Sequence, residues 1–251
     1  MTNKKNRKNN KNRHGLSRSI PPRVKLEVRQ RCGFGCVVCG SGLIQYDHVS
    51  PEYVDAKSHE PENIALLCPT CHDNKTRKYW SIQKILNAMQ NPACKKIGFT
   101  KNVFDFCGGH PKLKFGGITF EKSVYPIKID DEYLLKIDEP EFEGGPFRLS
   151  GFFYDSKGNR TLEIIENEWK AFTDTWDVIV SAGSISILDG PKNIVLKLSV
   201  EPPESITVEI LDMKVGVINF KIFNGETRIF FPGFDNKFMG SSTGGMQFKL
   251  K

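Results

Sequence analysis

The chain has 251 residues, enough for two modest domains or one large one. Hydrophobic residues make up 39% and charged residues 26%, and no apolar run approaches the length of a membrane span, so we expect a soluble protein. The net charge of +7 hides an asymmetry: residues 1–111 hold 19 Lys and Arg against 8 Asp and Glu, whereas residues 112–251 hold 17 against 21. We therefore expect only the front half to meet a polyanion.

Residues 1–18 are basic, rich in asparagine and nearly free of apolar side chains. Such a segment buries too little surface to offset its ordering entropy, so we predict that it is disordered. It would serve either as an arm that contacts phosphates or as a solvated tail, and the sequence does not choose between these. No hydrophobic stretch follows it, so it does not read as a secretory signal, and we expect a cytoplasmic protein.

Residues 19–91 have the pattern of a small mixed domain. The segment from Ser19 to Arg31 predicts a short helix, because Val24 and Val28 are spaced i, i+4 behind two prolines. A glycine-punctuated knuckle, RCGFGCVVCGSG, then leads to a predicted strand, LIQYDHV. After a loop, NIALLC precedes a helix that is expected to begin near Pro69 and to continue, with a break, to the stop at Asn91.

Four of the seven cysteines form two C-x-x-C pairs with 28 residues between them. Two such pairs predict one tetrahedral zinc site with four thiolate ligands, and they fit a reducing cytosol better than a disulfide framework. The predicted ligands of this structural Zn²⁺ are Cys36, Cys39, Cys68 and Cys71. Cys32 is interpreted as a small buried residue, and Cys94 and Cys107 have no partner at ligand spacing.

A histidine, His72, follows the second pair directly. If Cys71 lies in the first turn of a helix, His72 is about 100° further around the helix axis and cannot point at the same ion. It is expected to face a second centre, where Asp47 and His48 from the preceding strand would meet it. Consecutive strand residues point to opposite faces, so these two can share a substrate only at a strand end or a bulge.

With these motifs, residues 20–91 resemble the HNH endonuclease family, which has a ββα-metal fold. The resemblance rests on Asp47-His48, on Asn63 in ENIALLC and on His72 after the second C-x-x-C, with Lys75 where many members have a lysine. One departure is visible, because many members carry a paired glycine in the loop before the asparagine and this loop reads KSHEPEN. That departure concerns the geometry of the loop.

The resemblance implies a division of roles in phosphodiester hydrolysis. His48 would be the general base, Asp47 and His72 would hold one catalytic divalent cation, Mg²⁺ or another, and Asn63 would bond the loop backbone and fix His48. For His59 two alternatives stay open, assistance at the phosphate or a cap on the backbone. Three basic residues past the metal-binding turn would either contact the DNA backbone or form a solvated helix face: Lys75, Arg77 and Lys78.

Residues 112–251 read as an all-β domain, joined to the first domain by a linker at residues 92–111. Short strands alternate with turn signals, and Ile206, Val208 and Ile210 show the period-2 pattern of a half-buried strand. A sandwich, a barrel and a β-solenoid all fit this texture. The predicted fold class is therefore α+β, with a small zinc-stapled ββα-metal nuclease domain followed by an all-β domain.

The sequence as a whole predicts a metal-dependent DNA endonuclease, in the setting of restriction or anti-phage defence. The alternative is a non-catalytic zinc module that binds nucleic acid or a protein partner. The four cysteines fit both, whereas a binding module has no reason to contain Asp47-His48, Asn63 and His72. The acidic balance of the β domain favours protein contact or self-association over direct contact with DNA.

Overall fold

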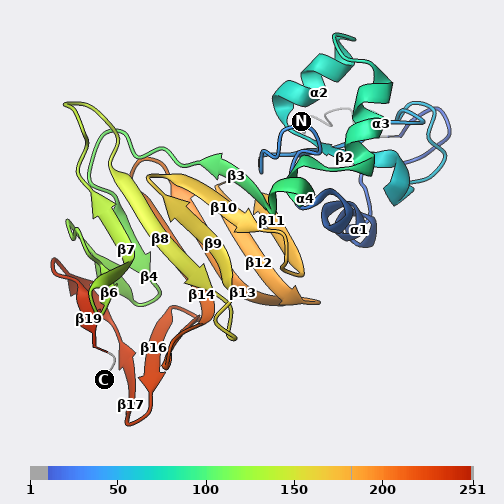
Figure 1. Cartoon of the computed structure of the whole chain (residues 1–251). Coiled ribbons are helices and arrows are strands. Elements are labelled where there is room, and N and C mark those ends of the chain that lie inside the picture. Colours follow the sequence, from blue (N-terminus) through green and yellow to red (C-terminus); the bar gives the residue numbers. More distant parts are fainter. Residues whose placement is uncertain (1–10, 182, 250–251) are drawn as a thin grey trace, which may run out of the picture. The chain divides into compact units, whose positions relative to one another are not determined.

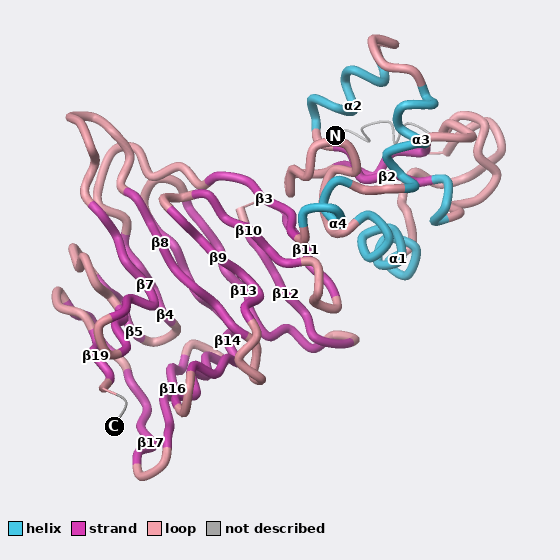
Figure 2. Tube along the Cα trace, viewed as in Figure 1, coloured by secondary structure: helices cyan, strands magenta, loops and turns pink. Residues whose placement is uncertain are grey.

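A computed structural model describes residues 11–181 and 183–249, and the chain divides into two compact units, Met1–Ile97 and Gly98–Lys251. Figure 2 shows that the helices of the described residues belong to the first unit and that the second is built from strands. None of these helices has the length and apolarity that crossing a membrane requires. The first ten residues of the predicted tail lie outside the described part of the chain.

The first unit is a ββα arrangement with additional helices on either side. Strands β1 and β2 pair antiparallel, with Asp47 opposite Ala65 and His48 opposite Ile64. Its elements in chain order are α1 (Pro22–Cys32), β1 (Gln45–His48), the 3₁₀ helix η1 (Pro61–Asn63), β2 (Ile64–Leu67), α2 (Pro69–Thr76), α3 (Ile82–Gln90) and α4 (Ala93–Ile97).

Local chemistry sets the helix ends. The Cys68 thiol accepts the N–H of Cys71 at the start of α2, and the Ser81 hydroxyl accepts that of Lys84 at the start of α3. Between them the helix expected from about Pro69 to Asn91 is broken, because Lys78 takes a left-handed conformation at φ 61°. The break expected in this helix is thus present.

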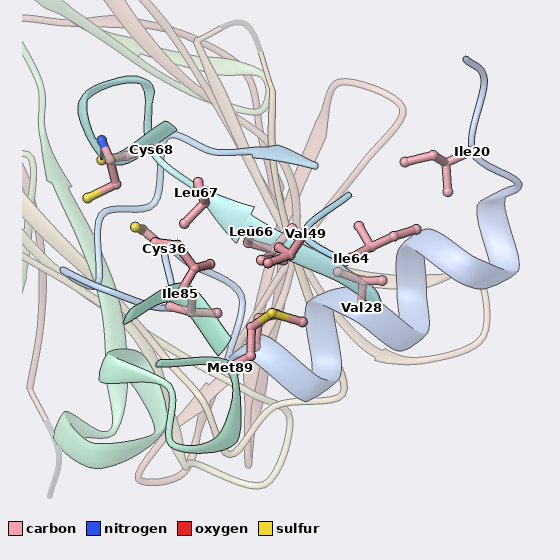
Figure 3. Packing of buried hydrophobic residues seen from close by; sticks show 14 residues of the cluster. Ile20, Val28, Cys36, Val49, Ile64, Leu66, Leu67, Cys68, Ile85 and Met89 are labelled. Atoms are coloured by element: carbon pink, nitrogen blue, oxygen red, sulfur yellow. Dashed lines mark hydrogen bonds between the residues drawn. The ribbon is translucent and has the colours of Figure 1, made fainter. Parts of the chain in front are cut away.

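The core of the first unit surrounds β2, whose residues Ile64–Leu67 are all buried. Val28 of α1 and Ile85 and Met89 of α3 pack into the same cluster, as Figure 3 shows. Two of the paired cysteines, Cys36 and Cys68, belong to it as well. Because β2 is covered all round, the strand that pairs with it and the helix that follows it are held in a fixed register.

Two segments differ from the sequence-based expectation. Residues 11–18, expected to be disordered, fold back on the loop after β1, where the side-chain amide of Asn12 donates to the carbonyl oxygens of Tyr53 and Ala56. The predicted linker at residues 92–111 contains α4 and a strand, β3 (Phe99–Val103), which pairs with β10 of the second unit. That pairing spans more than sixty residues and leaves no local mark in the sequence.

The second unit contains two open sheets among its described residues. The first has seven strands in the order β19-β6-β7-β8-β9-β10-β3, namely β19 (Met246–Phe248), β6 (Ile127–Ile129), β7 (Glu132–Asp138), β8 (Arg148–Tyr154), β9 (Arg160–Ile165), β10 (Glu168–Phe172) and β3. The second has ten, and its main run consists of β11 (Asp177–Ser181), β12 (Ser184–Gly190), β13 (Asn193–Glu201), β14 (Ser205–Val215), β15 (Ile218–Phe223), β16 (Glu226–Phe231) and β17 (Phe234–Phe238). Three short strands complete it: β4 (Lys112–Phe115), β5 (Ile118–Phe120) and β18 (Gly240–Ser242).

These two sheets contact each other through β8 and β14, and the layered arrangement is visible in Figure 1. The ring of Phe220 on β15 meets that of Phe248 on β19 edge to face at 5.7 Å. Trp169 of β10 is buried. The α+β class is confirmed, and because both sheets are open the barrel among the three predicted alternatives does not occur.

Candidate active site and zinc centre

The four paired cysteines converge on one point. Cys36 and Cys39 lie in the knuckle after α1, Cys68 caps α2 and Cys71 lies in its first turn, and all four sulfur atoms are within 4.8 Å of one another. The Cys39 Sγ atom is 3.6 Å from that of Cys68 and 3.8 Å from that of Cys71. Thiolates about 2.3 Å from a tetrahedral Zn²⁺ are roughly 3.8 Å apart, so the cluster fits one zinc ion.

Ionisation within the cluster is uneven. A hydrogen bond from Cys39 lowers the pKa of Cys36 to about 5, and the same hydrogen bond raises the pKa of Cys39. Burial, with the charge of Cys36 nearby, raises the pKa of Cys71 to about 12. Without a metal ion, the surrounding protein groups therefore do not keep all of these cysteines deprotonated at the same time. A bound divalent cation would stabilise them as thiolates.

The remaining cysteines lie apart from the cluster. Cys32 is buried, as expected, and Cys94 is buried with its thiol directed at the Gly40 carbonyl oxygen, 3.5 Å away. Cys107 is an exposed thiol of the second unit. Among the described residues, the four predicted cysteines are the one group of three or more potential metal ligands.

A second group of polar side chains lies where β1 faces α2. The Nε2 atom of His72 is 3.4 Å from Oδ1 of Asp47, so the predicted pair does come together. Two ligands that are each about 2.1 Å from one ion at 90–110° lie roughly 3.0–3.4 Å apart, which this spacing meets. An oxygen and a nitrogen ligand at this distance are compatible with a single divalent cation.

Lys75 takes part in the same group, contrary to both alternatives predicted for it, contact with the DNA backbone and a solvated helix face. Its side chain is only 7% exposed, and its Nζ atom is 2.7 Å from Oδ2 of Asp47, an ion pair without hydrogen-bond geometry. The ammonium also donates to the carbonyl oxygen of His48 at 3.2 Å. The physical reason is position, since Lys75 is three residues after His72 and so lies on the same helix face, next to the carboxylate.

His48 is the last residue of β1, and its side chain is almost fully buried. Its Nε2 atom is 3.0 Å from Nδ1 of His59, and the ring of Tyr53 meets it edge to face at 5.5 Å. Burial first, and then the neighbouring His59, lowers the pKa of His48 below its ordinary value. His48 is therefore a neutral imidazole near pH 7. The strand end expected at this position is present, and β1 pairs with β2 without a bulge.

Asn63 reaches this region through its backbone, since its carbonyl oxygen accepts the N–H of Val49 at 2.8 Å. Its side chain makes no hydrogen bond within the described part of the chain, so the predicted bond from that side chain to the loop remains a prediction. His59 was left with two alternative roles, and it contacts the side chain of His48. Its own Nε2 atom is buried and has no hydrogen-bond partner among the described residues.

The turn after α2 carries exposed basic and aromatic side chains. The Arg77 guanidinium is exposed and pairs with Asp73 at 2.9 Å, and Lys78 holds the left-handed position that ends the helix. Tyr79 is 75% exposed, while the neighbouring Trp80 packs against the core. Two predicted contacts to DNA, Arg77 and Lys78, are thus solvent-accessible, in contrast to Lys75.

Basic side chains of the tail pack against the loop after β1, a contact that the sequence does not predict. The described end of the basic tail covers the loop that carries Tyr53 and His59, where the Arg18 guanidinium lies 4.7 Å from the centre of the Tyr53 ring. Arg13 forms an ion pair with Asp55 of the same loop. Basic side chains therefore lie beside the loop that contacts His48.

Comparison with known families identifies the class to which this site belongs. Residues 30–78 match the HNH endonuclease family, and this segment contains both cysteine pairs, β1, β2 and α2. The resemblance of this segment to that family is thereby confirmed, and the match suggests a metal-dependent nuclease. Comparison of the chain with curated proteins and with solved structures gave no match.

Proposed function

We propose that the chain is a metal-dependent DNA endonuclease that hydrolyses phosphodiester bonds. The observation that carries this proposal is the contact between Asp47 and His72, which join a strand and a helix at 3.4 Å, with His48 the next residue of the same strand. A zinc-binding module requires only its thiolates. It has no need for a carboxylate, two imidazoles and a fixed register between them.

In this proposal Asp47 Oδ1 and His72 Nε2 hold one divalent cation, Mg²⁺ or another metal. Such a cation supplies Lewis-acid stabilisation of the charge that gathers on the phosphate and on the leaving oxygen. The carboxylate reaches this position because it is paired in register with Ala65 of the buried strand. The imidazole reaches it because Cys71, one residue earlier, is anchored in the thiol cluster.

His48 acts as the general base toward the attacking water. A base needs one ring nitrogen without a proton, and the contact with His59 determines which one is available. If Nε2–H of His48 donates to Nδ1 of His59, then Nδ1 of His48 carries no proton and can accept one from the water. In the other tautomer of His48, Nδ1 already carries the proton and cannot act as the base. His59 is thus proposed as the residue that orients His48 and fixes its tautomer.

The structural zinc holds the two halves of the active site together. Cys36 and Cys39 come from the segment before β1, and Cys68 and Cys71 from the start of α2. One ion bound to all four fixes the helix that carries His72 against the strand pair that carries Asp47. Structural zinc sites of this kind contribute directly to folding free energy.

DNA is the proposed substrate, and the turn at residues 77–79 is proposed to contact it. Arg77 and Lys78 offer positive charge to phosphates, and the exposed ring of Tyr79 offers a surface on which a base can stack. The excess of basic residues in the front half supports this choice. Restriction or anti-phage defence is the biological setting that we propose for such an enzyme.

A second candidate function is a non-catalytic zinc module, and one observation favours it. Lys75 already neutralises Asp47 in a buried ion pair, which would suffice for a purely structural role. Plasmid cleavage tests the two candidates, with Mg²⁺, Mn²⁺, Ni²⁺ and Zn²⁺ each added to wild type and to His72→Ala. The endonuclease predicts metal-dependent nicking or cutting that His72→Ala abolishes. A folded, zinc-loaded wild type that cuts with none of these metals would support the module.

A further inference from the structure

The outer strand of the ten-stranded sheet, β17, has a free edge. It pairs on one side with β16, with Arg228 opposite Lys237 and Phe230 opposite Asp235. On its other side it pairs with no strand of residues 11–181 or 183–249. Figure 1 shows the β16–β17 hairpin, in red, at the lower end of the second unit.

The turn of this hairpin determines which backbone groups point outward. Phe231 and Phe234 are paired across the two-residue turn formed by Pro232 and Gly233, and such a turn is closed by a hydrogen-bonded pair. Hydrogen-bonded and non-hydrogen-bonded pairs alternate along an antiparallel ladder. The backbone N–H and C=O groups of Asp235 and Lys237 are therefore the ones directed away from β16.

The sequence of this strand, Phe-Asp-Asn-Lys-Phe, is complementary to itself when read in the antiparallel direction. A second copy placed about a two-fold axis at Asn236 pairs Asp235 with Lys237 and Phe234 with Phe238. The outward-facing residues Asp235 and Lys237 then form the two hydrogen-bonded pairs, which the alternation along the ladder requires. Opposite charges and aromatic rings at facing positions stabilise antiparallel pairing.

The charges around the edge also favour an acidic side chain opposite Lys237. The Arg228 guanidinium binds Asp235, with Nε donating to Oδ1 at 2.7 Å, and Lys237 binds Glu226 at 2.6 Å. Yet Arg228 lies directly opposite Lys237 in the register, so two positive charges face each other. Asp235 of a second copy would lie on the open side of Lys237 and offset that repulsion.

Half-buried aromatic side chains follow the hairpin. The rings of Phe231 and Phe234 stack at 4.7 Å, and those of Phe234 and Phe238 stack at 6.3 Å, so that they form a row beside the free edge. Met239, the next residue, is 81% exposed. Pairing of two such edges would bring the aromatic rows of both copies together. The contact is short, so the dimer belongs to the class of small, concentration-dependent interfaces.

We propose that two copies of this chain associate through β17, which continues the ten-stranded sheet across a two-fold axis. Charged residues on an edge strand commonly prevent pairing, because like charges meet like. Here the alternation of Asp235 and Lys237 makes opposite charges meet, so these residues favour the second copy. The dimer does not depend on the nuclease activity, but it would bring two nuclease units into one assembly.

Exchange of the two charges provides the test, by sedimentation equilibrium on the full chain up to about 100 µM. Asp235→Lys places lysine opposite lysine in both symmetric pairs, and Lys237→Asp places aspartate opposite aspartate. We expect each variant alone to raise the dimer dissociation constant at least ~10-fold. A mixture of the two variants restores both opposite-charge pairs, so we expect a heterodimer to form with an affinity near that of wild type.

Asp212→Lys is the matched control, because it removes an ion pair with Lys221 on interior strands of the same sheet and leaves the edge unchanged. It should form dimers like wild type. Native mass spectrometry with one isotope-labelled variant identifies the heterodimer directly. A monomeric wild type over the whole concentration range would overturn the proposal. So would single variants that dimerise as well as wild type, or a mixture that remains monomeric.

Discussion

The Nζ atom of Lys75 lies 2.7 Å from Oδ2 of Asp47, at a position where both side chains are nearly excluded from solvent. The other oxygen of that carboxylate faces His72. One carboxylate thus contacts an internal ammonium on one side and a potential metal ligand on the other. The ammonium balances the charge of Asp47 within the protein, and a cation bound by Asp47 and His72 would share that charge.

Lys75→Met should therefore destabilise the first unit. The change leaves the buried carboxylate without its closest positive charge, a loss of about 3 kcal/mol for a broken buried pair. A divalent cation can replace the missing charge, so added Mg²⁺ should raise the melting temperature of Lys75→Met more than that of wild type. Calorimetry on the full chain measures both effects. Lys78→Met, in the turn after α2, is the control, and equal melting of all three proteins with and without Mg²⁺ would contradict this account.

His59 should affect the rate of cleavage and leave DNA binding unchanged. His59→Ala removes the acceptor for Nε2–H of His48, and loss of such an orienting partner typically costs about 10- to 100-fold. We expect that loss in kcat, with KM for DNA unchanged. His59→Gln keeps an oxygen acceptor and should recover part of the rate. Steady-state kinetics decides the matter, and equal kcat for the alanine and glutamine variants would rule out the orienting role.

Loss of a zinc ligand should unfold the first unit and leave the second intact. Cys68→Ser removes one of the four thiolates, and structural zinc contributes directly to folding. The serine hydroxyl can still accept the N–H of Cys71, so the cap of α2 is kept and the change tests the metal ligand alone. Metal analysis should show loss of zinc, and calorimetry should show that one of two transitions disappears. Cys94→Ser changes a buried thiol outside the cluster and should retain zinc. A Cys68→Ser protein that keeps the transition of the first unit without zinc would refute the role of the metal as a clamp.

The salt dependence of DNA binding should separate the exposed basic residues from the buried one. Each phosphate contact contributes about 0.9 to the slope of log K against log salt concentration. Arg77→Gln and Lys78→Gln should each lower that slope by about 1, whereas Lys75→Met should leave it unchanged because its ammonium is internal. Fluorescence anisotropy in a His48→Ala background measures binding without cleavage. A slope that falls with Lys75→Met as much as with Arg77→Gln would place Lys75 at the DNA.

The sequence predicts those parts of the site whose residues lie close together in the chain, because local backbone geometry then fixes their relative positions. Each C-x-x-C pair forces two thiols to one side of a turn, and His72 follows Cys71 on a helix, so its direction is fixed by helical geometry. Asp47 and His48 precede a break in the strand pattern, which places them at the strand end. The zinc cluster and the contact between Asp47 and His72 follow from these local rules.

The features that the sequence does not predict depend on contacts between distant segments. The burial of Lys75 requires the carboxylate of Asp47, twenty-eight residues earlier, to lie against its helix face. The contact of His59 with His48 depends on the path of an irregular loop. β3 forms a strand because its backbone pairs with β10, more than sixty residues later. Residues 11–18 are held in place because the Asn12 side chain donates to carbonyl oxygens of the loop after β1.

Cleavage of supercoiled plasmid by wild type and by His48→Ala, with zinc content and folding verified for both, tests the central claim most directly. The account predicts that wild type with a divalent cation converts the plasmid to nicked or linear forms. It also predicts that His48→Ala, which retains the zinc cluster and the contact between Asp47 and His72, is slower by at least about 100-fold. A folded His48→Ala protein that cuts as fast as wild type would contradict it.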